Sequence, residues 1–128
     1  MPRTRAVTVA FLLALASCHR LTSSEQKLVG TWSYSGMDFT TRVEFRADRT
    51  MATLMGDDDG RAWTPVTSGT WRVESNDLFL EEQALPNPHP LPGDTPRPKE
   101  SGRMTIREIT PDKLSWQDPR FPPYIRVK

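Results

Sequence analysis

The sequence predicts an all-β domain, a small antiparallel meander of about eight short strands that forms either a sandwich or an up-and-down barrel. Three observations lead to this prediction. Apolar and polar residues alternate with a period of two in many short stretches. Turn-forming residues separate most of these stretches. Beyond the first 17 residues no stretch shows sustained helical periodicity.

The alternating stretches give each predicted strand one buried face and one solvated face. Trp71 and Val73 share a face in the fourth stretch, and Ile125 and Val127 are the expected inward pair of the last stretch. The predicted strands are residues 28–34, 40–46, 49–55, 68–74, 77–82, 103–109, 113–117 and 124–128.

Composition excludes several classes of function. The 128 residues allow one domain, and their net charge of +1 points to neither nucleic acid nor an acidic partner. A single cysteine excludes a disulfide framework and a cysteine-built metal cluster. Two histidines leave little scope for a histidine metal site. We therefore expect neither a metal nor a cofactor.

Residues 1–17 have the layout of a secretory signal rather than of a folded element. Arg3 and Arg5 form a positive start, and the apolar run 6–16 is shorter than the roughly 20 residues that span a bilayer. The run ends in Leu15-Ala16-Ser17-Cys18, which resembles the bacterial lipobox.

The lipobox resemblance implies lipid attachment to the Cys18 thiol and cleavage before this residue. The alternative is an ordinary signal peptide with a chance or buried cysteine. We expect a signal peptide over 1–17, a lipidated tether over 18–27 and a barrel over 28–128. Acyl chains would anchor the protein in the cell envelope. His19 stands where the usual Gram-negative sorting rule has an aspartate for inner-membrane retention, so the outer membrane is expected.

A helical turn is predicted over 23–28, because Thr22 with Glu25, or Ser23 with Gln26, has the spacing of a capping box. Two connections are longer than hairpin turns, namely 56–67 and 83–102. In a meander both follow odd-numbered strands, so both should lie at the same end.

Gly30-Thr31-Trp32 after a helical turn resembles the first strand of a lipocalin or related calycin barrel, and small bacterial lipocalin-like domains are similar over residues 28–127. A hairpin at Phe45-Arg46-Ala47-Asp48-Arg49-Thr50 and the Gly69-Thr70-Trp71 strand fit this pattern. The threonine-aspartate-tyrosine motif of true lipocalins is absent. The resemblance implies a lipocalin-like barrel in which an arginine of the last strand, here Arg126, packs over the first tryptophan.

Aromatic and methionine side chains on the predicted inner faces are the candidate lining of an apolar ligand site. In so small a barrel they could equally fill the interior, and we favour a filled core. These candidates are Trp32, Phe45, Met51, Trp71, Met104 and Trp116.

The two long connections supply candidate contacts with a partner. Trp63 is expected in the first, as an exposed anchor or a cap over one barrel mouth. Pro86, Pro88 and Pro90 belong to the second, whose prolines favour an extended, stiff conformation.

Catalytic patterns are weak. Asp57-Asp58-Asp59-Gly60 lacks the alternate ligand spacing of a calcium loop, and His89 has no evident orienting partner. Glu81 and Glu82 are adjacent on a strand and face opposite ways. We therefore expect no enzyme. The expected function is a binding module for a small apolar or amphipathic molecule, and the alternative is an accessory or inhibitor that binds an envelope protein through its loops.

Overall fold

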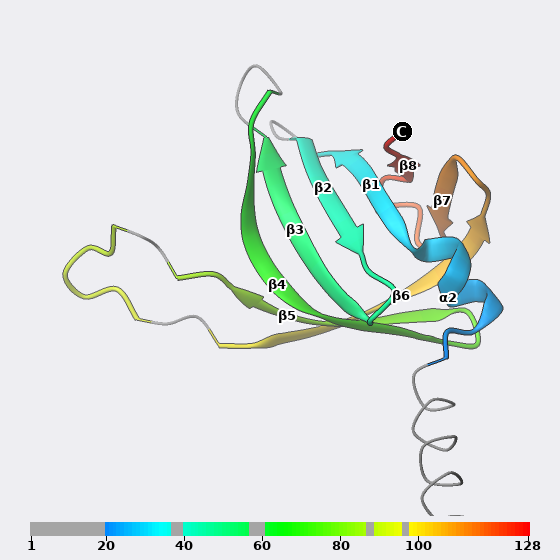
Figure 1. Ribbon diagram of the computed structural model, residues 1–128, viewed down its shortest axis with the longest axis horizontal. Coiled ribbons are helices and arrows are strands. Elements are labelled where there is room, and N and C mark those ends of the chain that lie inside the picture. Colours follow the sequence, from blue (N-terminus) through cyan, green and yellow to red (C-terminus); the bar gives the residue numbers. More distant parts are fainter. Residues whose placement is uncertain (1–19, 37–39, 57–60, 87–88, 96–97) are drawn as a thin grey trace, which may run out of the picture.

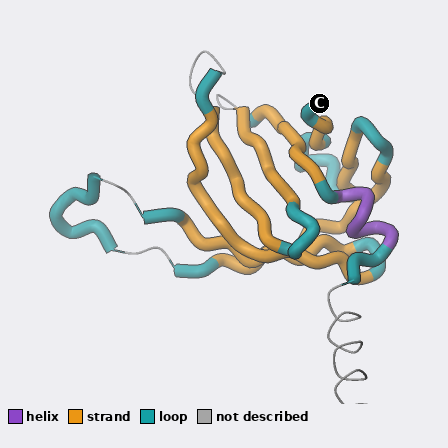
Figure 2. Tube along the Cα trace, in the orientation of Figure 1, coloured by secondary structure: helices purple, strands orange, loops and turns teal. Residues whose placement is uncertain are grey.

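The computed structural model describes residues 20–36, 40–56, 61–86, 89–95 and 98–128. These residues form a closed antiparallel barrel in which each strand pairs with the next and β1 pairs with β8 (Figures 1 and 2). This confirms the predicted all-β barrel. The elements are α2 (Ser23–Leu28), β1 (Gly30–Ser35), β2 (Thr40–Phe45), β3 (Thr50–Gly56), β4 (Trp63–Glu74), β5 (Asp77–Ala84), β6 (Glu100–Ile109), β7 (Lys113–Trp116) and β8 (Tyr124–Arg126).

Helix α2 is a short helix whose start is fixed by the predicted capping box. The Glu25 backbone N–H donates to Thr22 Oγ1 at 3.2 Å, and the Thr22 N–H donates to Glu25 Oε1 at 3.0 Å. Leu28 is fully buried at the end of the helix. Because so short a helix is not stable alone, its packing on the barrel holds it in place.

Arg126 joins β8 to the start of the barrel. Its guanidinium carbon lies 4.1 Å from the centroid of the Trp32 ring, and β8 pairs with β1 in the register Trp32↔Arg126. The same guanidinium donates to the carbonyls of Val29 at 3.0 Å, Lys27 at 2.6 Å and Pro111 at 2.6 Å. The contact implied by the calycin resemblance is therefore present, and it ties both ends of the barrel wall to α2.

The facing predicted for the last strand is wrong. Tyr124 is 8% exposed and faces the core, whereas Ile125 is 47% exposed. The register with β1 explains this, because Arg126 lies opposite the inward-facing Trp32 and therefore shares its face. Residue 124 must then face inward as well.

Strand β4 begins earlier than predicted, because residues 63–67 pair with β3 instead of lying in a loop. Trp63 is the first residue of β4, and the Arg42 guanidinium carbon lies 4.0 Å from the centroid of its ring. This side chain is half-buried on the outer surface of the sheet, opposite Gly56. The prediction of a loop tryptophan is therefore wrong.

Because successive strands are antiparallel, the connections after β1, β3, β5 and β7 all lie at the same end of the barrel. This agrees with the predicted placement of both long connections. The hairpin of β5 and β6 nevertheless projects sideways from the barrel, away from the connection between β3 and β4 (Figure 1). Helix α2 lies at the opposite end, together with the turns after β2, β4 and β6. We call these the open end and the helix end.

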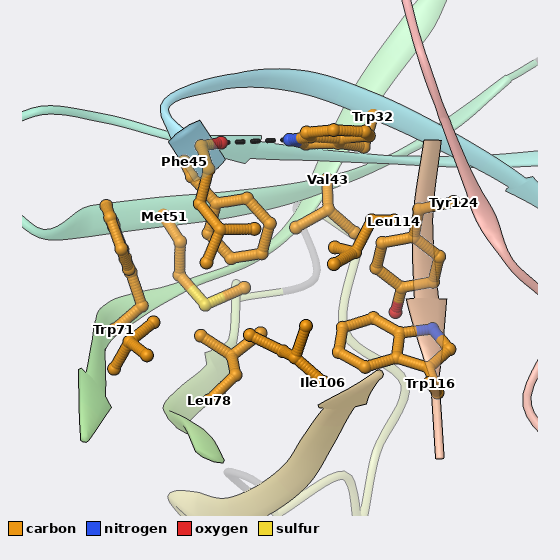
Figure 3. Close-up of a cluster of buried hydrophobic side chains, with 12 residues drawn as sticks. Trp32, Val43, Phe45, Met51, Trp71, Leu78, Ile106, Leu114, Trp116 and Tyr124 are labelled. Carbon is orange, nitrogen blue, oxygen red and sulfur yellow. Dashed lines mark hydrogen bonds between the residues drawn. The ribbon is translucent and has the colours of Figure 1, made fainter. Parts of the chain in front are cut away.

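Buried side chains fill the barrel at the helix end (Figure 3). The Trp32 indole N–H donates to the Leu28 carbonyl at 2.9 Å, and the Trp71 indole N–H donates to the carbonyls of Arg46 and Thr50. Each large indole is therefore buried with its polar atom satisfied. The core comprises Leu28, Trp32, Val43, Phe45, Met51, Trp71, Val73, Leu78, Ile106, Leu114, Trp116 and Tyr124.

Candidate binding site

The inward-facing side chains of the barrel are far less exposed at the helix end than at the open end. At the helix end Trp32, Phe45 and Met51 are no more than 1% exposed, and Trp71 is 2% exposed. Phe45 and Trp71 meet edge to face with their ring centroids 5.3 Å apart. The side chains at this end are packed against one another.

At the open end most inward-facing positions are only partly buried, whereas Tyr124, level with Tyr34, is buried. The registers place them on the same face as the core residues, since Tyr34 lies opposite Thr41 and Thr41 lies opposite Met55. Solvent therefore reaches the inner face of the barrel here. The partly buried set is Tyr34, Thr41, Met55, Thr67, Leu80 and Glu82.

A hollow in the barrel wall lies beside the end of β7. Strand β6 pairs with β5 from Glu100 to Thr105, and with β7 from Ile106 to Ile109. Beside the part of β6 that has no pairing with β7, a hollow of about 420 Å³ lies between β6 and the segment that follows β7. Met104 lines this hollow and also packs against the core. The lining is Arg103, Met104, Thr105, Gln117, Asp118 and Phe121.

Three aromatic rings stand in a row inside the barrel from β7 across β8 to β1. Trp116 meets Tyr124 edge to face at 4.9 Å, and Tyr124 stacks on Tyr34 with ring centroids 4.6 Å apart and planes inclined by 10°. Burial raises the pKa of Tyr124, and the nearby Tyr34 and Glu82 raise it further. The phenol of Tyr124 is therefore neutral and available for hydrogen bonding at physiological pH.

Glu82 brings a carboxylate to the inner face of the open end. Glu82 lies two and four residues after Leu80 and Leu78, which face inward, and it pairs with Gly69 on β4. It therefore faces the barrel interior as well. Thr67 Oγ1 donates to Glu82 Oε2 at 3.4 Å. Partial burial raises the pKa of Glu82, the Thr67 hydrogen bond lowers it, and repulsion from Glu100 raises it.

Glu81 behaves as an outer-face residue, as the alternation predicts. Its carboxylate pairs with the Lys99 ammonium at 2.9 Å, and both side chains are more than half exposed. The two adjacent glutamates thus face opposite sides of the wall, and the inner one has no cationic partner among the residues that the structure describes.

Glu25 forms a buried ionic centre at the helix end. It is 1% exposed and accepts hydrogen bonds from Arg49 Nη2 at 3.0 Å, Arg49 Nε at 3.1 Å and the Val73 backbone N–H at 3.3 Å. Burial acts to raise its pKa, but these hydrogen bonds and those from Thr22 prevail and lower the pKa to about 2. The carboxylate has its partners within the fold, so it serves structure rather than chemistry.

The six lining residues predicted from the sequence fall into two places. Trp32, Phe45, Met51 and Trp71 fill the helix end, whereas Trp116 and the partly buried Met104 lie toward the wall hollow. Ligand contact by any of the six stays a prediction. Sequence reasoning did not select Tyr34, Thr67, Glu82 or Tyr124, although the alternation within β5 contained the signal for Glu82.

The predicted loop contacts are on the surface where they are described. Pro86 and Pro90 are exposed. Pro88 and Cys18 lie outside the described residues, as do Asp57-Asp58-Asp59-Gly60.

Comparison with known families agrees with this architecture. The model of a lipocalin-like domain matches residues 20–116, from the residues before α2 to the end of β7. The chain belongs to this lipocalin-like family. Comparisons with curated proteins and with solved structures give no match. The lipocalin-like fold is a small-molecule-binding fold, typically without enzymatic activity, which is consistent with an inner face reached by solvent at the open end.

The described residues of the lipocalin-like domain contain no grouping of three or more histidine, cysteine, aspartate or glutamate side chains that could hold a metal ion. In the same part of the chain no helix has the length and apolar character needed to cross a membrane.

Proposed function

We propose that this protein is a lipid-anchored, non-enzymatic binding protein of the bacterial cell envelope that holds a small amphipathic molecule at the open end of its barrel. One observation carries the binding proposal. The inner face is packed at the helix end but reached by solvent at the open end. An inner face that is partly open to solvent at one end leaves a ligand a way to reach the barrel interior.

The chemistry of the open end favours an amphipathic molecule over a purely apolar one. Met55, Leu80 and the Tyr34 ring offer apolar contact surface. Thr41, Thr67 and Glu82 place hydroxyl and carboxylate groups on the same face. Binding sites that fix orientation combine an apolar lining with a few polar groups in this way.

Two substitutions on β2 test where the ligand binds. Thr41→Trp places a bulky ring on the inner face at the open end, whereas Thr40→Trp places the same ring on the outer face one residue away. We expect the neutral fluorophore N-phenyl-1-naphthylamine to bind the wild type, and Thr41→Trp to weaken this binding about tenfold. Thr40→Trp should leave it unchanged. Equal effects of both variants, or no probe binding at all, would refute an interior site.

Membrane anchoring rests on the sequence Leu15-Ala16-Ser17-Cys18. In a bacterial host, the wild type should incorporate radioactive palmitate and lose residues 1–17. Cys18→Ser should remain uncleaved and unlabelled. A wild-type protein that is released without acyl mass would contradict the anchoring proposal and leave the binding proposal intact.

A second candidate function is the binding of an envelope protein through the β5–β6 hairpin. Its support is the exposure of apolar side chains on this projecting arm, with Leu85 41% and Leu91 71% exposed. Replacing residues 86–98 by a short glycine-serine link should abolish capture of such a protein while the β-sheet circular dichroism persists. If the shortened protein unfolds, the arm has a structural role and this candidate is wrong.

A further inference from the structure

Glu82 is a carboxylate on the inner face of the barrel, where it is partly buried. The hydrogen bond that it accepts from Thr67 is long at 3.4 Å. Removing a carboxylate from water without a cation to pair with it costs free energy. Glu100, directly across the pair of strands, adds like charge.

The surrounding cations do not relieve this cost. Lys99 is held at 2.9 Å by Glu81 on the outer face. Arg103 pairs with Phe79, which adjoins the inward-facing Leu80 on β5 and therefore faces outward. Arg103 shares the face of Phe79 and also points away from the interior. Among the described residues, therefore, the fold supplies Glu82 with a hydroxyl but with no positive charge.

An aromatic surface shares the interior with this carboxylate. Tyr34 and Tyr124 stack at 4.6 Å, and the charge of Glu82 reaches Tyr124 strongly enough to raise its pKa. Aromatic faces attract cations through their quadrupole, and a carboxylate attracts them directly. An anion would meet repulsion from Glu82 and Glu100.

We propose that the open end of the barrel selects organic cations, with Glu82 as the residue that determines this specificity and the partly buried ring of Tyr34, which stacks on the buried Tyr124, as the surface over which the cationic group lies. The ligand class is an ammonium group on an apolar chain or ring. The chain would lie along Leu80 and Met55, which share the inner face. This inference rests on the proposed function, because it names the kind of molecule that the same site accepts.

Three molecules with equal chains measure the selectivity: decyltrimethylammonium, decanol and decanoate, each below its critical micelle concentration, by isothermal titration calorimetry. The trimethylammonium group donates no hydrogen bond, so its advantage over the alcohol reports charge and cation–π attraction. We expect the wild type to bind the cation about tenfold more tightly than decanol, and decanoate more weakly than either.

The variant Glu82→Gln keeps the shape of the side chain and removes its charge. It should bring the affinity for the cation to within about twofold of that for decanol, while decanol binding stays unchanged. Glu81→Gln, one residue away on the outer face, is the matched control and should keep the preference of the wild type. Circular dichroism verifies that both variants fold.

A titration of the wild type provides the same test without a variant. The groups that face Glu82 are Thr67 on β4, Glu100 on β6 and Tyr124 on β8, with Tyr34 stacked on Tyr124. Because burial raises the pKa of Glu82, its carboxylate loses charge as the pH falls from 7 to 4. The affinity for the cation should fall over this range while that for decanol stays constant.

The outcomes separate the two proposals. If decanol binds but the cation binds no more tightly, or if Glu82→Gln retains the preference, the selectivity for cations is refuted and the binding function stands. If none of the three molecules binds, both proposals are wrong.

Discussion

Replacement of Glu25 by glutamine tests whether the buried ionic centre stabilises the barrel through its charge. The pKa of Glu25 is about 2 in the folded protein against an ordinary value of 4.5. This difference corresponds to about 3 kcal/mol of folding free energy at neutral pH. Because the folded pKa is depressed, the stabilisation is fully present above pH 4.5 and is lost as the pH falls toward 2.

The expected result is a gap between the two proteins that depends on pH. Glu25→Gln should be less stable than the wild type by about 3 kcal/mol at pH 7, and by about 1 kcal/mol at pH 3. Urea unfolding followed by tryptophan fluorescence measures both values, and urea adds no salt that would screen the ion pair. A gap of the same size at both pH values would show that the loss comes from packing rather than from the carboxylate charge.

Asp118 supplies the control. Its pKa is also lowered to about 2, by hydrogen bonds from the Arg120 side chain and backbone, but the pair lies at the surface with Arg120 85% exposed. Solvent screens such pairs. Asp118→Asn should therefore leave the stability nearly unchanged at both pH values, although the two carboxyl groups have similar pKa values.

Three further substitutions, the first with Gly102→Ala as its control, test the packing around the first strand by urea or thermal unfolding at pH 7. Gly30→Ala should lower the free energy of unfolding by about 1–3 kcal/mol, because φ is +136° and a β-carbon would lie 2.5 Å from Arg126 Nη1. In the control Gly102→Ala the added atom meets nothing within 4 Å, so this variant should be nearly neutral. Equal costs in the two variants would contradict this reasoning. Arg126→Met should cost about 2 kcal/mol through the loss of charged hydrogen bonds to the carbonyls of Val29 and Lys27, and an unchanged midpoint would refute that role. Trp32→Ala should cost about 3–5 kcal/mol, and a melting temperature within a degree or two of the wild type would contradict its placement in the core.

The strands were predictable because each carries its own alternation. Residues 40–46 and 77–82, for example, become β2 (Thr40–Phe45) and β5 (Asp77–Ala84) with small changes at their ends. The start of β4 was not predictable in the same way. Residues 63–67 contain Pro65 and share a bulge with β3, so they interrupt the regular pattern that indicates a strand.

The last strand shows where alternation fails. Tyr124 and Ile125 are both apolar and lie on opposite faces of a strand that is three residues long, so the pattern contains little information about which face is buried. Long-range contacts decide it, since Arg126 must reach the Trp32 ring. Such a contact between residues almost a hundred positions apart is not visible in any local window.

The buried ionic centre and the open-end carboxylate were missed for different reasons. The capping box identified Glu25 as a helix-start residue, but its partner Arg49 lies on another element and no local signal connects them. Glu82 was correctly expected to face away from Glu81, yet the role proposed for it depends on the Tyr34–Tyr124 stack, which comes near Glu82 only when the barrel closes.

Closure through β8 also has a consequence for the order of folding. The hydrogen bonds of Arg126 to Val29 and Lys27 join residues 97 and 99 positions apart, whereas the hairpins along the meander join near neighbours. Bringing such distant segments together is entropically slow, and barrels rich in non-local pairs fold in milliseconds to seconds. Until Tyr124–Arg126 docks, one side of β1 and one side of β7 present unpaired backbone groups to other molecules. The nascent barrel is therefore most prone to aggregation in the interval before its first and eighth strands meet.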